Sequence, residues 1–158
     1  MEDVSRALEM RVRNVCKTQS RYRVLWIVGE PLVGKTTLCQ DVCKHQRWRY
    51  INFTLDAGFF DSLIGREETY RPADFLTDLF NWCASTIEEF IVFDEIEPLL
   101  GLWNWDQQEL FFRLIGREPS LKTGVVLVTR ARTAQQLCAT LSDMSQDHVY
   151  EITQGVVL

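Results

Sequence analysis

The sequence predicts an α/β fold of three layers, in which helices cover both faces of a parallel β-sheet. Short apolar segments alternate along the chain with segments whose apolar residues recur at helical spacing, and this alternation favours parallel pairing of the strands. The apolar segments are nearly continuous, as in residues 23–28, which is typical of strands buried on both faces. Together these two observations predict a five-stranded parallel sheet.

The predicted elements follow one another without repeat or linker. A leading amphipathic helix is predicted over residues 3–18, because Val4, Leu8, Val12 and Val15 share one helical face. Strands are predicted at residues 23–28, 50–55, 89–94, 124–129 and 148–152. One helix is predicted to follow residues 29–36 and to end near residue 44. Further helices are predicted at residues 57–65, 72–86, 105–117 and 133–142, and Pro72 opens the helix at 72–86. We expect one domain over residues 1–158, with a leading helix in 1–20 and a core of 22–152.

Composition excludes several classes of function. The chain is 46% apolar and 25% charged, as in ordinary globular proteins. No apolar run approaches the ~20 residues of a membrane span, and the N-terminal segment has no apolar stretch for a signal peptide. We therefore expect a cytoplasmic protein without membrane contact. Five cysteines without a CxxC pair and two isolated histidines argue against zinc sites and histidine triads, and the cysteines are expected to be packing residues.

Charge is distributed unevenly along the chain. Residues 1–50 carry ten Lys and Arg against five Asp and Glu, whereas residues 51–158 carry seven against seventeen. Such asymmetry can steer partners or subunits together, although a solvated basic helix explains it equally well. The basic residues that could line a phosphate backbone are Arg6, Arg11, Arg13, Lys17, Arg21 and Arg23. They lack interleaved aromatics and a known reading motif, so direct DNA contact is left open.

Residues 29–36 match the pattern G-x-x-x-x-G-K-[ST] in every position. Gly29 and Gly34 permit backbone angles that turn N–H groups toward phosphate oxygens, and the following helix directs its positive dipole end at the same anion. Lys35 adds a charge at the β- and γ-phosphates, and the Thr36 hydroxyl ligates Mg²⁺. The motif therefore predicts binding of a nucleotide through its phosphates, together with Mg²⁺. The residues predicted to bind the nucleotide are Gly29, Glu30, Pro31, Leu32, Val33, Gly34, Lys35, Thr36 and Thr37.

Acidic residues follow the third predicted strand. Asp94 ends this strand, where a carboxylate can hold the hydration shell of Mg²⁺ together with Thr36. Glu95 can then polarise a water for attack on the γ-phosphate. Glu97 is a rival for this role, and the sequence does not decide which carboxylate faces the site. Glu95 is preferred because it directly follows the metal-side aspartate.

Thr129 ends the fourth predicted strand, where a hydroxyl can hydrogen-bond the γ-phosphate or the attacking water. The alternative is a threonine that simply ends a strand. Arginines flank the same strand, and each is a candidate to reach a neighbouring subunit's γ-phosphate as an arginine finger. These candidates are Arg113, Arg117, Arg130 and Arg132.

The phosphate loop, the Asp94-Glu95 pair and the polar Thr129 resemble the additional-strand P-loop ATPases, the AAA+ group, over residues 22–152. The resemblance implies the sheet order 5-1-4-3-2, ATP with Mg²⁺, and work through subunit contacts. It also implies a helical lid domain after the fifth strand. Because the sequence ends at Leu158, we expect no C-terminal lid, and expect a partner or second subunit to complete enclosure of the nucleotide.

A narrower resemblance is to the BrxF family of small P-loop proteins in BREX bacteriophage-defence systems. It is carried by residues 22–25 before the loop, residues 50–53, Arg71-Pro72, and the segment 93–100. It implies an ATP-binding defence component that self-associates or acts with other defence proteins on invading DNA.

Three function classes remain open at this point. The first is an ATPase that oligomerises or docks on a larger complex. The second is a nucleotide-binding interaction module with negligible hydrolysis, and the third is a small P-loop kinase. An aromatic patch around residues 102–112 adds a candidate partner surface, since Trp103 and Trp105 flank a predicted helix cap at Asn104 or Asp106.

Overall fold

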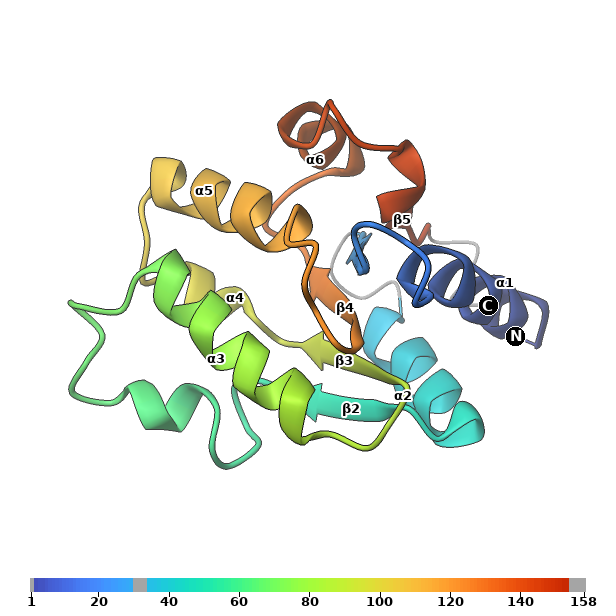
Figure 1. The fold of residues 1–158 in the computed structure, drawn as a ribbon, viewed down its shortest axis with the longest axis horizontal. Helices are drawn as coiled ribbons and strands as arrows, with labels where there is room; N and C mark the ends of the chain where they lie inside the picture. The colour runs from blue at the N-terminus through green and yellow to red at the C-terminus, as the bar shows by residue number, and fades with distance from the viewer. Residues whose placement is uncertain (1, 30–33, 154–158) are drawn as a thin grey trace.

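A computed structural model describes residues 2–29 and 34–153 of the chain. One five-stranded sheet has the order β2-β3-β4-β1-β5 (Figure 1), and every neighbouring pair of strands is parallel. This is the predicted order 5-1-4-3-2 read from the opposite edge. The strands are β1 (Val24–Val28), β2 (Arg49–Asn52), β3 (Phe90–Asp94), β4 (Gly124–Thr129) and β5 (Val149–Glu151).

Helices cover both faces of the sheet, which confirms the three layers (Figure 1). On one face lie α1 (Glu2–Cys16) and α2 (Lys35–Gln46). On the other lie α3 (Pro72–Ser85), α5 (Trp105–Gly116) and α6 (Ala134–Thr140). Three short helices complete the described chain: η1 (Phe60–Leu63), α4 (Glu97–Leu100) and η2 (Gln146–His148).

The central strands are buried on both faces, as their apolar sequences predict. In β1, Leu25 and Ile27 belong to the core beneath α1 and α2. Trp26 points to the opposite face, where its ring lies 5.8 Å from Phe111 and 5.0 Å from Phe112, centroid to centroid. Two apolar cores therefore enclose the sheet and hold the carboxyl ends of β1, β3 and β4 at one edge.

The second strand is shorter than predicted, because β2 ends at Asn52 rather than residue 55. The Asn52 side-chain oxygen accepts hydrogen bonds from the backbone N–H groups of Thr54 and Leu55. Such Asx contacts compete with the strand ladder and turn the chain. Local side-chain chemistry therefore overrides the apolar pattern.

The helix predicted over residues 57–65 is only the 3₁₀ turn η1. Gly58 and Gly65 bracket this turn with φ angles of 94° and 88°, in the left-handed region that glycine tolerates. These two reversals prevent a continuous α-helix. The helix predicted from Pro72 is confirmed as α3. The short helices α4 and η2 were not predicted.

The aromatic patch is divided between core and surface. Asn104 is the N-cap of α5, since its side chain accepts from the N–H of Gln107. Trp103 is buried, and its indole N–H donates to the Tyr70 carbonyl over 2.9 Å. Trp105 is 54% exposed. Only the second tryptophan is thus available at the surface.

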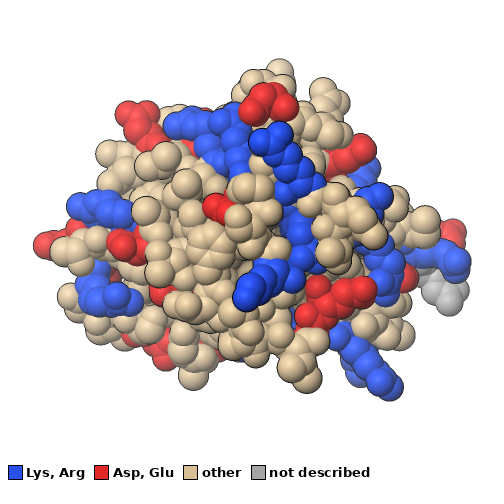
Figure 2. Space-filling model, viewed as in Figure 1, with Lys and Arg blue, Asp and Glu red and all other residues tan. Residues whose placement is uncertain are grey.

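Several N-terminal arginines attach α1 to the rest of the chain. Arg23 is buried and donates to the carbonyls of Cys16 and Leu121. Arg13 pairs with Glu9 within α1 and with Glu89, the residue before β3. On the face drawn in Figure 2, Lys and Arg side chains are interrupted by acidic and uncharged ones. No helix among the described residues is long and apolar enough to cross a membrane.

Candidate functional site

The two described ends of the phosphate-loop motif, Gly29 and residues 34–36, lie close together. Gly34 has a φ of 85° and precedes the first residue of α2, Lys35. This left-handed conformation explains why glycine stands there. The Lys35 ammonium group donates to the Gly29 carbonyl over 2.9 Å. The predicted nucleotide-binding residues Glu30, Pro31, Leu32 and Val33 lie outside the described residues.

Thr36 and Asp94 meet at the adjacent end of β3. The Thr36 hydroxyl donates to Asp94 Oδ2 over 2.7 Å, and Asp94 is only 4% exposed. The Tyr50 hydroxyl donates to the same oxygen over 2.6 Å. The second carboxylate oxygen, Oδ1, accepts the N–H of Glu95 over 2.8 Å. The aspartate predicted to lie on the metal side is therefore fixed by three donors from three different segments.

Glu95 leaves β3 in an unusual backbone conformation. Its φ is 58°, which is uncommon for a residue with a side chain, and its carbonyl accepts the Thr54 hydroxyl over 2.7 Å. Burial, and then the charges of Asp94 and Glu97, raise the pKa of Glu95. Strained residues held by their neighbours are enriched at functional sites.

Glu97 is tied to the end of β4. Its Oε2 accepts the Thr129 hydroxyl over 2.8 Å and the Arg130 backbone N–H over 2.9 Å. Burial lowers the pKa of Lys35, and the carboxylates of Glu97 and then Asp94 oppose this effect. Both rival glutamates therefore belong to the same electrostatic cluster as the loop lysine.

A single cavity of about 260 Å³ brings these side chains together. It is lined by residues from the loop, from the end of β3 and from the end of β4, although these segments are far apart in sequence. The predicted site residues at this cavity are Gly34, Lys35, Thr36, Thr37, Asp94, Glu95, Glu97, Thr129 and Arg130. Hydroxyl and carboxylate oxygens dominate the Thr36–Asp94 side of the cavity, and these are the ligands that Mg²⁺ prefers.

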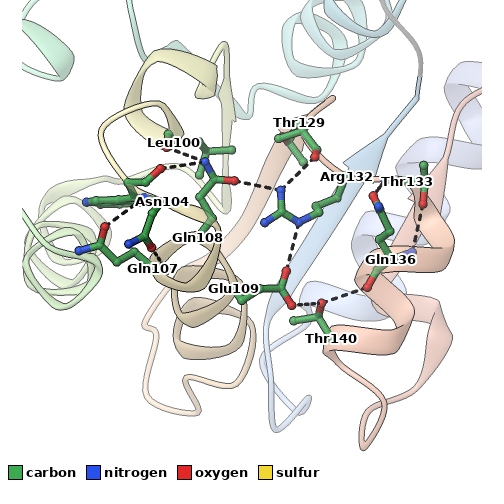
Figure 3. A network of polar contacts seen from close by, with 12 residues as sticks. Leu100, Asn104, Gln107, Gln108, Glu109, Thr129, Arg132, Thr133, Gln136 and Thr140 are labelled. Atoms are coloured by element: carbon green, nitrogen blue, oxygen red, sulfur yellow. Dashed lines mark hydrogen bonds and ion pairs between the residues drawn. The ribbon is translucent and has the colours of Figure 1, made fainter.

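The four candidate arginines have different environments. Arg130 lines the cavity of its own chain. Arg132 is buried and donates to Glu109 and Gln108 of α5 (Figure 3). Arg117 pairs with Asp143 over 2.6 Å. Among the described residues, neither Arg113 nor Arg130 has a side-chain hydrogen bond or ion pair, and of these two only Arg113 lies away from the cavity.

Sequence reasoning missed Tyr50 and Thr54 as site residues. Both contacts cross from the β2 segment to the end of β3, and they join residues 44 and 41 positions apart. The register that places Asn52 beside Asp94 is a property of the folded sheet. No letter pattern around Tyr50 or Thr54 signals it.

No protein-family model matches the sequence, and no curated protein is similar enough to count as a relative. Solved structures do match. A Walker-type ATPase of Pyrococcus abyssi matches with a TM-score of 0.50 and 15% identity, over 96% of this chain and 52% of its own. PCH-2 of C. elegans matches with a TM-score of 0.49 and 16% identity, over 96% and 42% of the two chains.

The RuvB Holliday junction branch migration motor of Thermotoga maritima matches with a TM-score of 0.48 and 14% identity, over 97% of this chain and 44% of its own. The chain thus spans about half the length of these proteins or less. The match to the Pyrococcus protein concerns the fold. That fold is the P-loop ATPase fold.

Proposed function

We propose that the chain binds ATP with Mg²⁺ and hydrolyses it. The observation that carries the proposal is the 2.7 Å contact between the Thr36 hydroxyl and the buried Asp94 carboxylate, in a cavity that Lys35 also lines. A lysine, a hydroxyl and a carboxylate converging beside a left-handed glycine turn form a phosphate and metal site. The P-loop ATPase fold supports the same proposal.

Each group at the cavity has a distinct task in this proposal. Thr36 and Asp94 hold the metal ion, which supplies charge neutralisation at the β- and γ-phosphates when it is bound. Lys35 contacts the same phosphates. Glu95 orients the attacking water and accepts its proton, and its raised pKa brings it closer to the pH at which general bases are most effective. Thr129 senses the γ-phosphate by donating a hydrogen bond to it.

The first experiment measures nucleotide binding by titration calorimetry. Lys35→Ala is expected to abolish detectable binding of Mg·ATP, because it removes the cation at the phosphates. Lys44→Ala is the matched control, since Lys44 is an exposed lysine in the last turn of the same helix. Equal ATP affinity in wild type and Lys35→Ala would remove the assignment of the site.

The second experiment measures phosphate release. Glu95→Gln is expected to bind Mg·ATP but to lower turnover by about 10²- to 10⁴-fold, the range typical of general-base catalysis. Full turnover in this variant would mean that Glu95 is not the base. ATP binding without turnover by the wild type would instead favour the nucleotide-binding interaction module.

We further propose that the site is completed by a second copy or a partner protein. Specific activity that rises with protein concentration would support completion between copies, and Arg113→Ala would then be expected to lower activity in trans. Arg132→Ala is a poor test of the same role, because Arg132 is buried and bonded to α5. Specific activity independent of concentration would indicate a self-sufficient site.

A defence role with other BREX proteins, and DNA contact through such a complex, are proposals that rest on the sequence resemblance to the BrxF family. Co-purification of the chain with the other proteins of such a system tests the first. Binding to DNA that weakens with added salt tests the second. Absence of both would leave the ATPase proposal intact and remove the defence role.

A further inference from the structure

Glu97 is the carboxylate at the cavity that β4 holds in place. Its Oε2 accepts from the Thr129 hydroxyl over 2.8 Å and from the Arg130 N–H over 2.9 Å. The Thr129 oxygen in turn accepts the N–H of Ala131 over 3.0 Å. A hydroxyl has a single proton to donate, so Thr129 commits its proton to Glu97 in this arrangement.

The same donors are those that a γ-phosphate would use. Thr129 and Arg130 line the cavity beside Lys35. Among the charged groups, Glu97 has the largest effect on the pKa of Lys35, which it raises. A γ-phosphate bound there would be a second anion seeking the same hydroxyl, the same N–H and the same ammonium group. Two anions at one site disfavour each other. ADP, which has no γ-phosphate, would leave the Glu97 contacts unchanged.

We propose that Glu97 is a specificity-determining residue that competes with the γ-phosphate for Thr129 and Arg130, and thereby sets the affinity for ATP relative to ADP. The inference rests on the proposed nucleotide site. It assigns to Glu97 a role separate from that of the catalytic base. ATP can bind Thr129 and Arg130 only when Glu97 gives up its hydrogen bonds to them, whereas ADP leaves these bonds in place. The competition therefore lowers the affinity for ATP but not that for ADP.

Glu97 connects the cavity to the apolar core through its own helix. Glu97 is the first residue of α4, and Leu99 and Leu100 of that helix are buried in the core shared with α3 and α5. The Glu97 carbonyl accepts the N–H of Gly101. Glu97 therefore begins a helix whose two leucines belong to the same core as α3 and α5.

The test compares the affinities for Mg·ADP and for a non-hydrolysable Mg·ATP analogue in the full chain. Glu97→Gln keeps the shape of the side chain and removes its charge. We expect its preference for the ATP analogue over ADP to rise about five- to tenfold, within the range of ordinary coupling between sites. ADP affinity is expected to change little.

Glu95→Gln is the matched control. It removes one negative charge from the same cavity, but Glu95 is not the acceptor of the Thr129 or Arg130 donors. We expect any rise in its ATP-to-ADP preference to be smaller than that of Glu97→Gln, because Glu95 has no contact with Thr129 or Arg130 to give up when a γ-phosphate binds. An equal rise in both variants would overturn the proposal in favour of general charge repulsion.

A double-mutant cycle with Thr129→Val tests the competition itself. Both Glu97 and the γ-phosphate would accept from the Thr129 hydroxyl. The increase in ATP preference caused by Glu97→Gln is therefore expected to be smaller when that hydroxyl has already been removed. Additive effects would contradict the proposal. Circular dichroism of each variant verifies that it is folded.

Three further outcomes are decisive. An unchanged preference in Glu97→Gln overturns the inference while leaving the nucleotide site in place. Loss of turnover in Glu97→Gln with an unchanged preference identifies Glu97 as the base, which also overturns it. A wild-type chain that binds neither nucleotide removes the proposed function and the inference together.

Discussion

At the scale of single residues, the buried Asp94 carboxylate is the centre of the candidate site. Its two oxygens accept from Thr36, Tyr50 and the Glu95 backbone. A buried carboxylate is costly unless it is hydrogen-bonded, and these donors give both Asp94 oxygens a partner. Tyr50 contributes to this site although it lies outside every sequence motif.

Removal of the Tyr50 hydroxyl gives a prediction at this scale. Tyr50→Phe is expected to raise the Mg²⁺ concentration needed for half-maximal nucleotide binding about tenfold. The reason is that hydrogen-bond partners of metal ligands typically contribute factors of 10 to 100 to metal affinity. Binding is measured across a Mg²⁺ titration. Tyr150→Phe is the matched control, since the Tyr150 ring packs against Arg11 away from the cavity. Similar Mg²⁺ dependence in all three proteins would show that Tyr50 has no such role.

At the scale of elements, the segment after β4 connects the cavity to α5 and α6. Arg132 donates to Glu109 and Gln108, and Glu109 accepts the Thr140 hydroxyl of α6 (Figure 3). The guanidinium carbon also lies 3.5 Å from the Trp105 ring centroid. Thr129 and Arg130 immediately precede this cluster, so the cavity and the α5–α6 surface share one segment.

Arg132→Met tests the energetic weight of this cluster. The substitution leaves Glu109, whose side chain is 19% exposed, without its cation, and we expect a loss of about 1–3 kcal/mol in the free energy of unfolding. Urea denaturation followed by tryptophan fluorescence measures the change, and the native emission of Trp105 should also shift. Arg113→Met, in α5 with Glu109, is the control and should leave the free energy of unfolding within about 0.5 kcal/mol of wild type.

Close packing between α1 and β4 gives a second prediction for elements. A Cβ at Gly124 would lie 2.5 Å from a Phe90 ring carbon and 2.7 Å from the Cys16 carbonyl oxygen. Gly124→Ala is therefore expected to destabilise the protein by about 1–3 kcal/mol through overpacking. At Gly116 the nearest atoms are 3.2 Å away, so Gly116→Ala should cost less. Equal unfolding midpoints in urea for both variants would contradict this account of the interface.

At the scale of the whole molecule, the two cores on either side of the sheet protect most of the thiols. Cys16, Cys39, Cys43 and Cys83 are buried, whereas Cys138 is partly exposed. Burial raises the pKa of Cys16 and of Cys43 to about 12 and that of Cys83 to about 11, and it also raises the pKa of Cys39. Reactive thiolates are therefore scarce in the folded state, in agreement with the expected packing role.

A thiol-reagent titration tests this whole-molecule prediction. At neutral pH the folded protein should react at one thiol, Cys138, and at all five only after unfolding. Cys138→Ser should leave no rapidly reacting group. Rapid reaction at two or more thiols in the folded wild type would show that one of the two cores opens readily.

The outcome for the elements shows which patterns are reliable. The continuous apolar runs of β1, β3 and β4 predicted buried strands correctly, because burial on both faces leaves no place for polar residues. Failures occurred where local side chains dominate. Asn52 turned the chain before the predicted end of its strand, and Gly58 and Gly65 restricted a predicted helix to one 3₁₀ turn.

The sequence by itself determined the α/β class, the order of the elements and the phosphate-loop motif, because periodicity and motif spacing are local properties of the chain. Only the tertiary structure decided which side chains meet. The contact between Glu97 and Thr129 joins residues 32 positions apart, and the contact between Tyr50 and Asp94 joins residues 44 apart. Such contacts depend on strand register and on the packing of the layers, and these arise only when distant segments of the chain pair.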